Sequence, residues 1–238
     1  MPHPHTIPAV ADSRGRHDIY RFIHKALRKA QCEMLIRLGN TDYAGAGVPA
    51  LVADLRSLMA LGAAHISHEE AHVHTALDQR APGATETAMH QHGSHRQSFR
   101  LIESIVDRLE SAQAERRPAI GRELYLTYSA FIAHDFEHMF EEETAVNGQL
   151  WMHFDDAALR AIEGAIVASL PPERVVATMR LMIPAISRGE RLELLGFIKA
   201  GAPKPAFDAI IEMAARPILT PDDFAHLAHG LGLLETAH

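Results

Sequence analysis

The sequence predicts an all-α protein, with an antiparallel up-down-up-down four-helix bundle over residues 16–150 and additional C-terminal helices over residues 151–238. Apolar residues recur at steps of three and four almost throughout the chain, and patterns typical of strands are nearly absent. Proline and glycine interrupt the periodicity at spaced positions, which divides it into helix-sized pieces. Residues 1–15 precede the first predicted helix and form an N-terminal segment.

The four predicted bundle helices are bounded by residues that favour helix ends. Pro49 and Pro118 are suited to a first helical turn. Gly39-Asn40 and Pro82-Gly83 are suited to stop a helix. The expected helices cover residues 16–39, 49–79, 87–115 and 118–148.

After Trp151 the pattern changes to shorter amphipathic helices. Asp155 or Asp156 is expected to cap a helix that runs to about Leu170, where Pro171-Pro172 breaks it. Three or four more helices are expected, because turn residues recur at 187–189, 201–203 and 220–221. This extension has few metal-binding residues, and we expect it to pack against the bundle or to form a homodimer contact.

Composition excludes several classes of function. The 238 residues carry a formal charge of −7 and no basic stripe, which argues against nucleic acid as a partner. No apolar stretch in the sequence approaches the ~20 residues that span a bilayer, so no membrane partner is expected. The first eight residues lack the cationic and apolar blocks of a signal peptide. The single cysteine, Cys32, excludes an internal disulfide, fits a cytoplasmic location and is expected to be a small buried core residue.

One arrangement of residues occurs twice. Residues 65–70 read His-Ile-Ser-His-Glu-Glu and residues 138–143 read His-Met-Phe-Glu-Glu-Glu, and a leucine follows each first histidine by twelve positions. On a helix, positions i and i+4 lie on the same face, so each copy presents an imidazole and a carboxylate to one neighbour. A metal ion requires this combination, and an apolar core would disfavour it. The four predicted ligands are His65, Glu69, His138 and Glu142.

A mirror relation places further histidines at the same level. In an up-down-up-down bundle, residues at one height lie equally far from the turn that joins their helices. The midpoints of His24 and His65, of His65 and His95, and of His95 and His138 are 44.5, 80 and 116.5, and all lie at or beside predicted turns. His92 competes with His95 for the position on the third helix, with His95 slightly favoured, and both are kept as candidates.

The ligand types limit the choice of metal. Imidazole and carboxylate suit iron, manganese or zinc. Two carboxylates from facing helices, each able to bridge, favour a pair of ions over one. Four histidines and two glutamates then give each iron two nitrogens and two oxygens, with coordination positions left open for a small molecule.

On these residues the chain resembles the hemerythrin-like (HHE cation-binding) family. The resemblance covers residues 16–150, and the remainder is similar to the helical tail of longer bacterial members. It implies a non-haem di-iron centre inside a four-helix bundle, with carboxylates from the second and fourth helices bridging two iron ions, or manganese or zinc in their place. The implied metal site consists of His24, within Ile-His-Lys-Ala-Leu-Arg at 23–28, with His65, Glu69, His92, His95, His138 and Glu142.

Two departures from the oxygen carriers of that family shift the expected role. Those carriers typically have His-x-x-x-His on the third helix and His-x-x-x-x-Asp on the fourth. Here His92 and His95 are three apart, and Glu142 follows His138 by four. We therefore expect binding or sensing of oxygen, nitric oxide or peroxide, or iron storage, rather than reversible oxygen transport.

Two alternatives stay open. A ferritin-like di-iron oxidase would use Glu69-x-x-His72, with Asp135-x-x-His138 as an imperfect second copy. A metal-free helical interaction module would use its histidines to respond to pH. No nucleophile, phosphate loop or acid–base pair is evident outside the metal layer, so the sequence does not establish an enzyme.

The side chains beside the predicted ligands have other expected places. Glu70, Glu141 and Glu143 are expected to be solvated. His68 is expected to be an outer partner, and His72 an outer partner or part of the Glu69-x-x-His72 motif. Four further histidines are expected to be solvated or to act as outer partners: His74, His90, His134 and His153.

Overall fold

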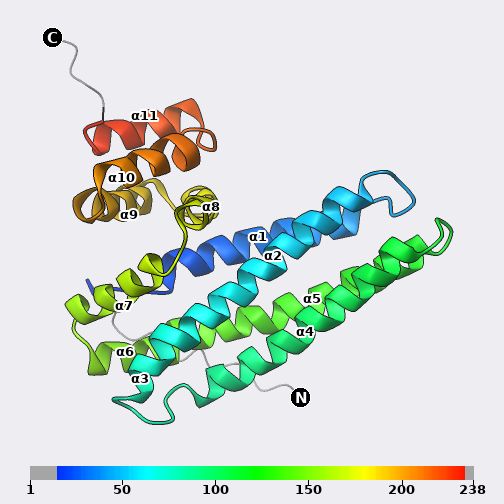
Figure 1. Cartoon of the computed structure of the whole chain (residues 1–238), viewed down its shortest axis with the longest axis horizontal. Helices are drawn as coiled ribbons and strands as arrows, with labels where there is room; N and C mark the ends of the chain where they lie inside the picture. Colours follow the sequence, from blue (N-terminus) through cyan, green and yellow to red (C-terminus); the bar gives the residue numbers. More distant parts are fainter. Residues whose placement is uncertain (1–14, 234–238) are drawn as a thin grey trace, which may run out of the picture. The chain divides into compact units, whose positions relative to one another are not determined.

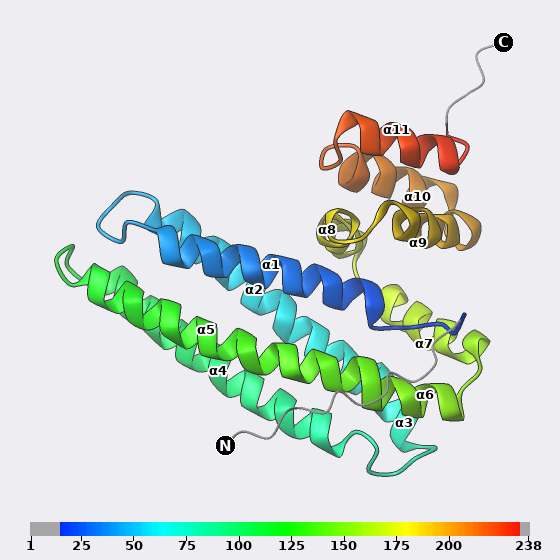
Figure 2. The same cartoon turned by 180° about the vertical axis from the view of Figure 1, so that it is seen from behind.

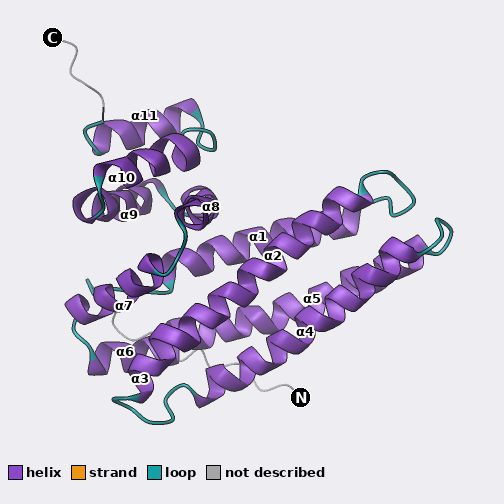
Figure 3. Cartoon of the chain, in the orientation of Figure 1, coloured by secondary structure: helices purple, strands orange, loops and turns teal. Residues whose placement is uncertain are grey.

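A computed structural model describes residues 15–233 of the chain. Every regular element in this range is a helix, so the all-α prediction is confirmed (Figure 3). All but the last residue of the predicted N-terminal segment lies outside the described residues. The described residues form two compact units, one made of residues 15–21 and 30–166 and the other of residues 22–29 and 167–233. The predicted boundary between residues 150 and 151 stays a prediction.

The long helices of the first unit follow the predicted ranges closely. Views from opposite sides agree that α4 (Glu86–Ser111) and α5 (Arg117–Glu141) run side by side (Figures 1 and 2). Two of the long helices continue through π-helical segments into a short terminal helix. The elements are α1 (Arg21–Asn40), α2 (Val48–His68), η1 (Glu69–His74), α3 (Thr75–Asp78), α4 (Glu86–Ser111), α5 (Arg117–Glu141), η2 (Glu142–Val146), α6 (Asn147–His153) and α7 (Asp156–Ala168).

The connections occur where helix-stopping residues predict them. Residues 41–47, 79–85 and 112–116 link the long helices. Gly83 takes a φ of +84°, a left-handed conformation that favours glycine. Pro118 lies in the first turn of α5, as expected from its fixed φ and missing N–H.

Two apolar clusters occupy different levels of the first unit. The first cluster gathers the parts of the long helices next to residues 41–47 and 112–116, and it includes Leu55, Ile102 and Phe131. The second gathers their opposite ends, and it includes Val73, Leu77, Ala88, Val146 and Leu150. Along α2, α4 and α5, the predicted metal ligands fall between the residues of these two clusters. The polar layer is therefore bounded by apolar side chains on both sides.

The second unit is built from shorter helices and has its own core. Ser187 and Glu190 form a capping box at the start of α9, and the carboxylate of Glu190 also accepts a hydrogen bond from Lys25. Burial acts to raise the pKa of Glu190, but Lys25 and the backbone N–H of Ser187 outweigh it and lower that pKa to about 2. The elements are α8 (Pro172–Met182), η3 (Ile183–Ala185), α9 (Arg188–Gly201), α10 (Lys204–Ile210), η4 (Ile211–Ala215) and α11 (Pro221–Gly230).

Two expectations from composition need correction. Cys32 is exposed rather than buried. The buried face of α1 passes through Gln31 and Met34, and Cys32 lies outside that face. The continuous helix from Val48 to Asp78 is long and apolar enough to cross a membrane, whereas no such stretch was expected. The core helix of a water-soluble bundle meets the same criterion, so this helix does not by itself assign the chain to a membrane.

Gly121 on α5 provides a test of the packing in the first unit. A Cβ at Gly121 would overlap the ring of Tyr43, whose hydroxyl donates a hydrogen bond to the carbonyl of Leu38. Gly121→Ala is expected to lower the free energy of unfolding by about 1–3 kcal/mol. Gly164→Ala, in α7 with open space around the new methyl group, is expected to raise it by about 0.5–1 kcal/mol. Urea denaturation of both variants measures these changes, and equal effects would contradict the described packing.

Candidate metal centre

The two copies of the His-x-x-x-Glu repeat adopt the same local structure. In each copy an α-helix carries the histidine, and a π-helical segment begins at the glutamate, at Glu69 in η1 and at Glu142 in η2. Short π-helical segments are rare and occur frequently at functional sites. The leucines twelve residues after each histidine, Leu77 and Leu150, are fully buried. The two copies therefore share their local structure as well as their sequence. The periodicity of the sequence did not predict the π-helices.

Four buried side chains from three helices converge on one point. The Nε2 atoms of His92 and His138 are 3.0 Å apart. His92 Nε2 is 3.5 Å from Oε2 of Glu69 and 3.6 Å from Oε1 of Glu142, and His138 Nε2 is 3.3 Å from Oε2 of Glu142. One ligand atom from each of these four residues lies within 4.8 Å of all the others. This set is compact enough to hold one metal ion.

A second set shares both carboxylates with the first. His24, His65, Glu69 and Glu142 also offer ligand atoms within 4.8 Å of one another. His65 Nε2 is 3.0 Å from Oε1 of Glu69, and His24 on α1 is fully buried. Glu69 and Glu142 belong to both sets. Glu69 places Oε1 next to His65 and Oε2 3.5 Å from His92 Nε2, so its two oxygens face different sets. Six of the seven predicted ligands thus occur in two sets that share two carboxylates.

The outward nitrogens of two histidines are held by hydrogen bonds. Nδ1 of His92 lies 3.1 Å from Oε1 of Glu70, and Nδ1 of His138 lies 2.8 Å from Oε1 of Gln91. Both partner atoms are acceptors, so each Nδ1 carries a hydrogen and each Nε2 directs its lone pair inward when the ring is neutral. Two lone pairs that face each other across 3.0 Å need a cation between them, either a proton or a metal ion. Hydrogen bonds of this kind fix a metal-binding imidazole in the required orientation.

Glu70 differs from its expected place in solvent. Its carboxylate accepts two hydrogen bonds from Arg96, at 2.8 and 2.6 Å, in addition to the contact with His92. The hydrogen bond from Arg96 lowers the pKa of Glu70 and keeps it ionised. Its partners come from α4, so the spacing within the repeat does not identify them.

Without a metal, a proton on His92 balances part of the negative charge of Glu69 and Glu142. Burial by itself lowers the pKa of His92, but the carboxylates of Glu142 and Glu69 outweigh it and raise that pKa to about 10. Burial lowers the pKa of His138 to about 4, so this imidazole is neutral at pH 7. Burial and the charge of Glu69 act to raise the pKa of Glu142, but hydrogen bonds from His74 and His92 bring it below its usual range. A metal ion would replace the proton on His92.

His95 lies next to the four converging side chains but has a different partner. Its Nδ1 is 3.4 Å from Oδ1 of Asp135, and the other oxygen of that carboxylate, Oδ2, accepts a hydrogen bond of 2.6 Å from Nε2 of Gln31. The His95 ring packs edge-on against His138 with ring centroids 4.8 Å apart. His95 belongs to neither set of four, so the geometry favours His92 on this helix.

The preference for His95 came from using His65 as the reference level. Three of the four residues in the compact set are one helical turn away from that level. With Glu69 as the reference, the midpoint with His92 is 80.5, which also falls in the connection between α3 and α4. Both histidines therefore satisfy the mirror relation, and only the side-chain geometry separates them.

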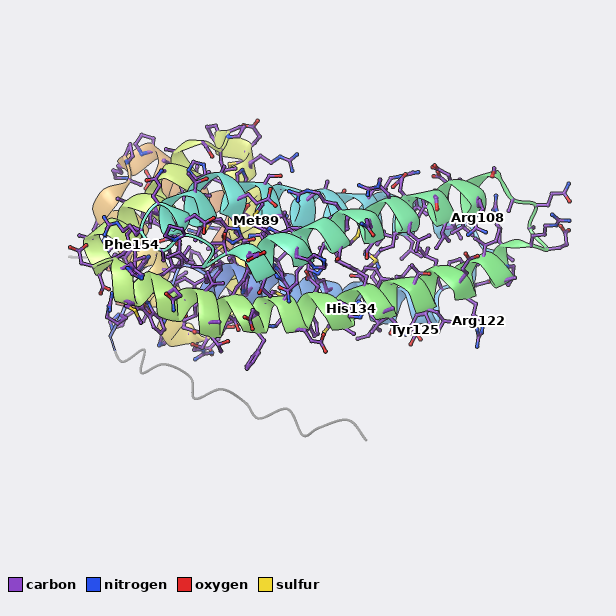
Figure 4. The ribbon with its side chains drawn as sticks, turned by 90° about the horizontal axis from the view of Figure 1, so that it is seen from below. Met89, Arg108, Arg122, Tyr125, His134 and Phe154 are labelled. Carbon is purple, nitrogen blue, oxygen red and sulfur yellow. The ribbon has the colours of Figure 1, made fainter. Side chains whose placement is uncertain are left out.

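His74 is buried although it was expected in solvent or as an outer partner. Its Nε2 is 3.6 Å from Oε1 of Glu142, and its ring stacks on His92 with centroids 5.1 Å apart. Its Nδ1 is 3.4 Å from the sulfur of Met89, which is labelled near the start of α4 in Figure 4. His134, labelled on α5 in the same view, is exposed. His74 is thus an outer partner of Glu142, which is one of the two places expected for it.

A cavity of about 570 Å³ lies on another part of the same unit. It is lined by the connection between α3 and α4 together with parts of α4, α5, η2 and α6, including Thr87, Glu141 and Gln149. None of the seven predicted ligands lines it. The cavity is therefore separate from the converging side chains.

Comparison of the chain with protein-family models, curated proteins and solved structures finds no match. The resemblance to hemerythrin-like proteins consequently depends on the residues themselves. Those residues fit a metal: the donor set contains only imidazole nitrogens and carboxylate oxygens, which suit iron, manganese and zinc.

Replacing each α4 histidine separately tests which one binds the metal. His92→Ala is expected to weaken Co²⁺ binding by at least tenfold, because it removes a nitrogen that lies within 3.6 Å of both carboxylates. His95→Ala is expected to change Co²⁺ affinity much less, since its imidazole is directed to Asp135. Calorimetric titration measures both affinities. A larger loss in His95→Ala than in His92→Ala would reverse the assignment.

Proposed function

We propose that this chain is a hemerythrin-like, non-haem di-iron protein that binds or senses oxygen, nitric oxide or peroxide, or stores iron. The observation that carries this proposal is the convergence of His92 Nε2, His138 Nε2 and the carboxylates of Glu69 and Glu142 inside a protein core. Acceptor atoms that face each other in this way need a cation. Iron fits the donor set, and manganese or zinc are substitutes.

The proposed architecture is an antiparallel, up-down-up-down four-helix bundle of α1, α2, α4 and α5. Short connections at residues 41–47, 79–85 and 112–116 support it, because they favour antiparallel neighbours. One apolar cluster also draws buried residues from all four helices, including Met34, Leu55, Ile102 and Phe131. In such a bundle, metal ligands project into the core from facing helices.

The residues of the chain have distinct roles in this proposal. Glu69 and Glu142, shared by both sets of four, would bridge two ions. His92 and His138 would complete one ion, and His24 and His65 the other. When bound, the two ions would supply redox chemistry and open coordination positions for a small ligand. The apolar clusters on either side of the layer exclude water from it.

Two observations weigh against the ferritin-like alternative. That arrangement requires His72 and Asp135 as ligands. His72 belongs to neither set of four, and Asp135 contacts Gln31 and His95.

The proposal has two further parts. The first is a cytoplasmic location, which fits the single exposed cysteine. The second is a homodimer contact through the C-terminal helices.

Iron loading tests the proposal. The protein reconstituted with Fe²⁺ without oxygen is expected to retain about two iron ions per chain, measured by metal analysis after desalting. Free metal at about 100 times the Kd stabilises the native state by about 2.7 kcal/mol. For a chain of this size, that corresponds to a rise in Tm of roughly 5–10 °C. A metal-free module predicts no rise, and retention of fewer than one iron per chain would contradict the proposal.

A pair of variants locates the bound iron. Glu142→Ala removes a carboxylate shared by both sets and is expected to abolish retention of both ions. Glu143→Gln, one residue further along η2, is the matched control and is expected to retain both. Equal iron contents in the two variants would place the metal elsewhere.

A further inference from the structure

The two histidines of the compact ligand set have outer partners of different charge. The hydrogen on Nδ1 of His92 is directed to the carboxylate of Glu70, at 3.1 Å. The hydrogen on Nδ1 of His138 is directed to the neutral amide oxygen of Gln91, at 2.8 Å. A carboxylate acceptor makes the opposite nitrogen of an imidazole a stronger donor to a metal than an amide acceptor does. The two imidazoles are therefore chemically unequal.

Arg96 fixes the carboxylate that contacts His92. It donates two hydrogen bonds to Glu70, one to each oxygen, at 2.8 and 2.6 Å. This bidentate geometry restricts rotation of the carboxylate and balances its charge. The chain of contacts runs from Arg96, whose side chain is 38% exposed, through Glu70 to the fully buried His92. It links the surface of the protein to the proposed metal centre.

The internal repeat provides a position equivalent to Glu70. Glu70 follows Glu69 as Glu143 follows Glu142, so the two glutamates occupy equivalent positions. The charge of Glu143 acts on Asp18, whose pKa is raised by burial and, to a smaller extent, by that charge. The partners of His92 and His138, Glu70 and Gln91, are therefore unequal although the ligands are repeated.

We propose that Glu70, held by Arg96, is a positioning residue that orients His92 for coordination and makes it a stronger metal donor than His138. The inference rests on the proposed function, because it concerns the ion held by Glu69, His92, His138 and Glu142. It assigns the asymmetry of the centre to residues that do not touch the metal. Removal of such an outer partner typically weakens metal binding by about 10–100-fold.

Co²⁺ titration of Glu70→Gln tests the inference. Glutamine keeps the size of the side chain and removes its charge and the bidentate contact with Arg96. One of two binding events is expected to weaken by about tenfold or more. The visible absorption bands of bound Co²⁺, which report coordination geometry, are expected to change as well. Glu143→Gln, the equivalent change in the other copy of the repeat, is expected to leave affinity and spectrum as in the wild type.

Two further variants separate this role from a loss of folding. Arg96→Gln, at a partly exposed position, is expected to reduce the affinity in the same direction but by less, because Glu70 remains. Adding Gln91→Glu to Glu70→Gln is expected to recover part of the lost affinity by giving His138 a carboxylate partner. A structural defect alone would not produce this recovery.

The outcomes distinguish the inference from the proposed function. If the wild type binds two Co²⁺ ions and Glu70→Gln binds them with unchanged affinity and spectrum, the inference is wrong and the metal centre stands. If the wild type binds no Co²⁺, or Glu142→Ala binds as much as the wild type, both fail.

Discussion

The burial of two carboxylates beside two imidazole lone pairs is the constraint on which this structure depends. Glu69 and Glu142 lie at one level of an apolar core, where an uncompensated charge is costly. In the metal-free protein the protonated imidazole of His92 balances part of this charge. A divalent cation at the same place would satisfy more acceptor atoms than one proton does. Under the proposed function, this layer of the fold is organised around a metal ion held by these side chains.

The apolar clusters determine how strongly that requirement acts. They bound the polar layer on both sides and limit the access of water to the carboxylates. In the proposed function, a metal ion would compensate the two carboxylates in place of water. The π-helices η1 and η2 begin at the two glutamates and lead into apolar residues, Val73 and Val146. Each π-helical segment changes the rotation of its helix between the glutamate and the valine of the second cluster. The same few residues therefore determine both the direction of the glutamate and the packing of the valine.

The all-α class, most helix bounds and most of the side chains that converge follow from the sequence, because they depend on periodicity. Helix bounds follow proline and glycine positions, and the repeated His-x-x-x-Glu spacing identifies the residues that converge. The choice between His92 and His95 does not follow, since both satisfy the same mirror relation within one helical turn. Glu70 and His74 were placed in solvent or left as minor partners, because their contacts come from α4 and η2 and spacing within one helix does not encode them.

X-ray absorption at the iron edge of the reconstituted protein tests the central claim most directly. Two iron ions bridged by Glu69 and Glu142 predict nitrogen and oxygen neighbours and an iron–iron vector of about 3.5–4 Å. Glu142→Ala is expected to remove that vector. A spectrum of isolated iron, or one with sulfur neighbours, would contradict a shared carboxylate centre in this core.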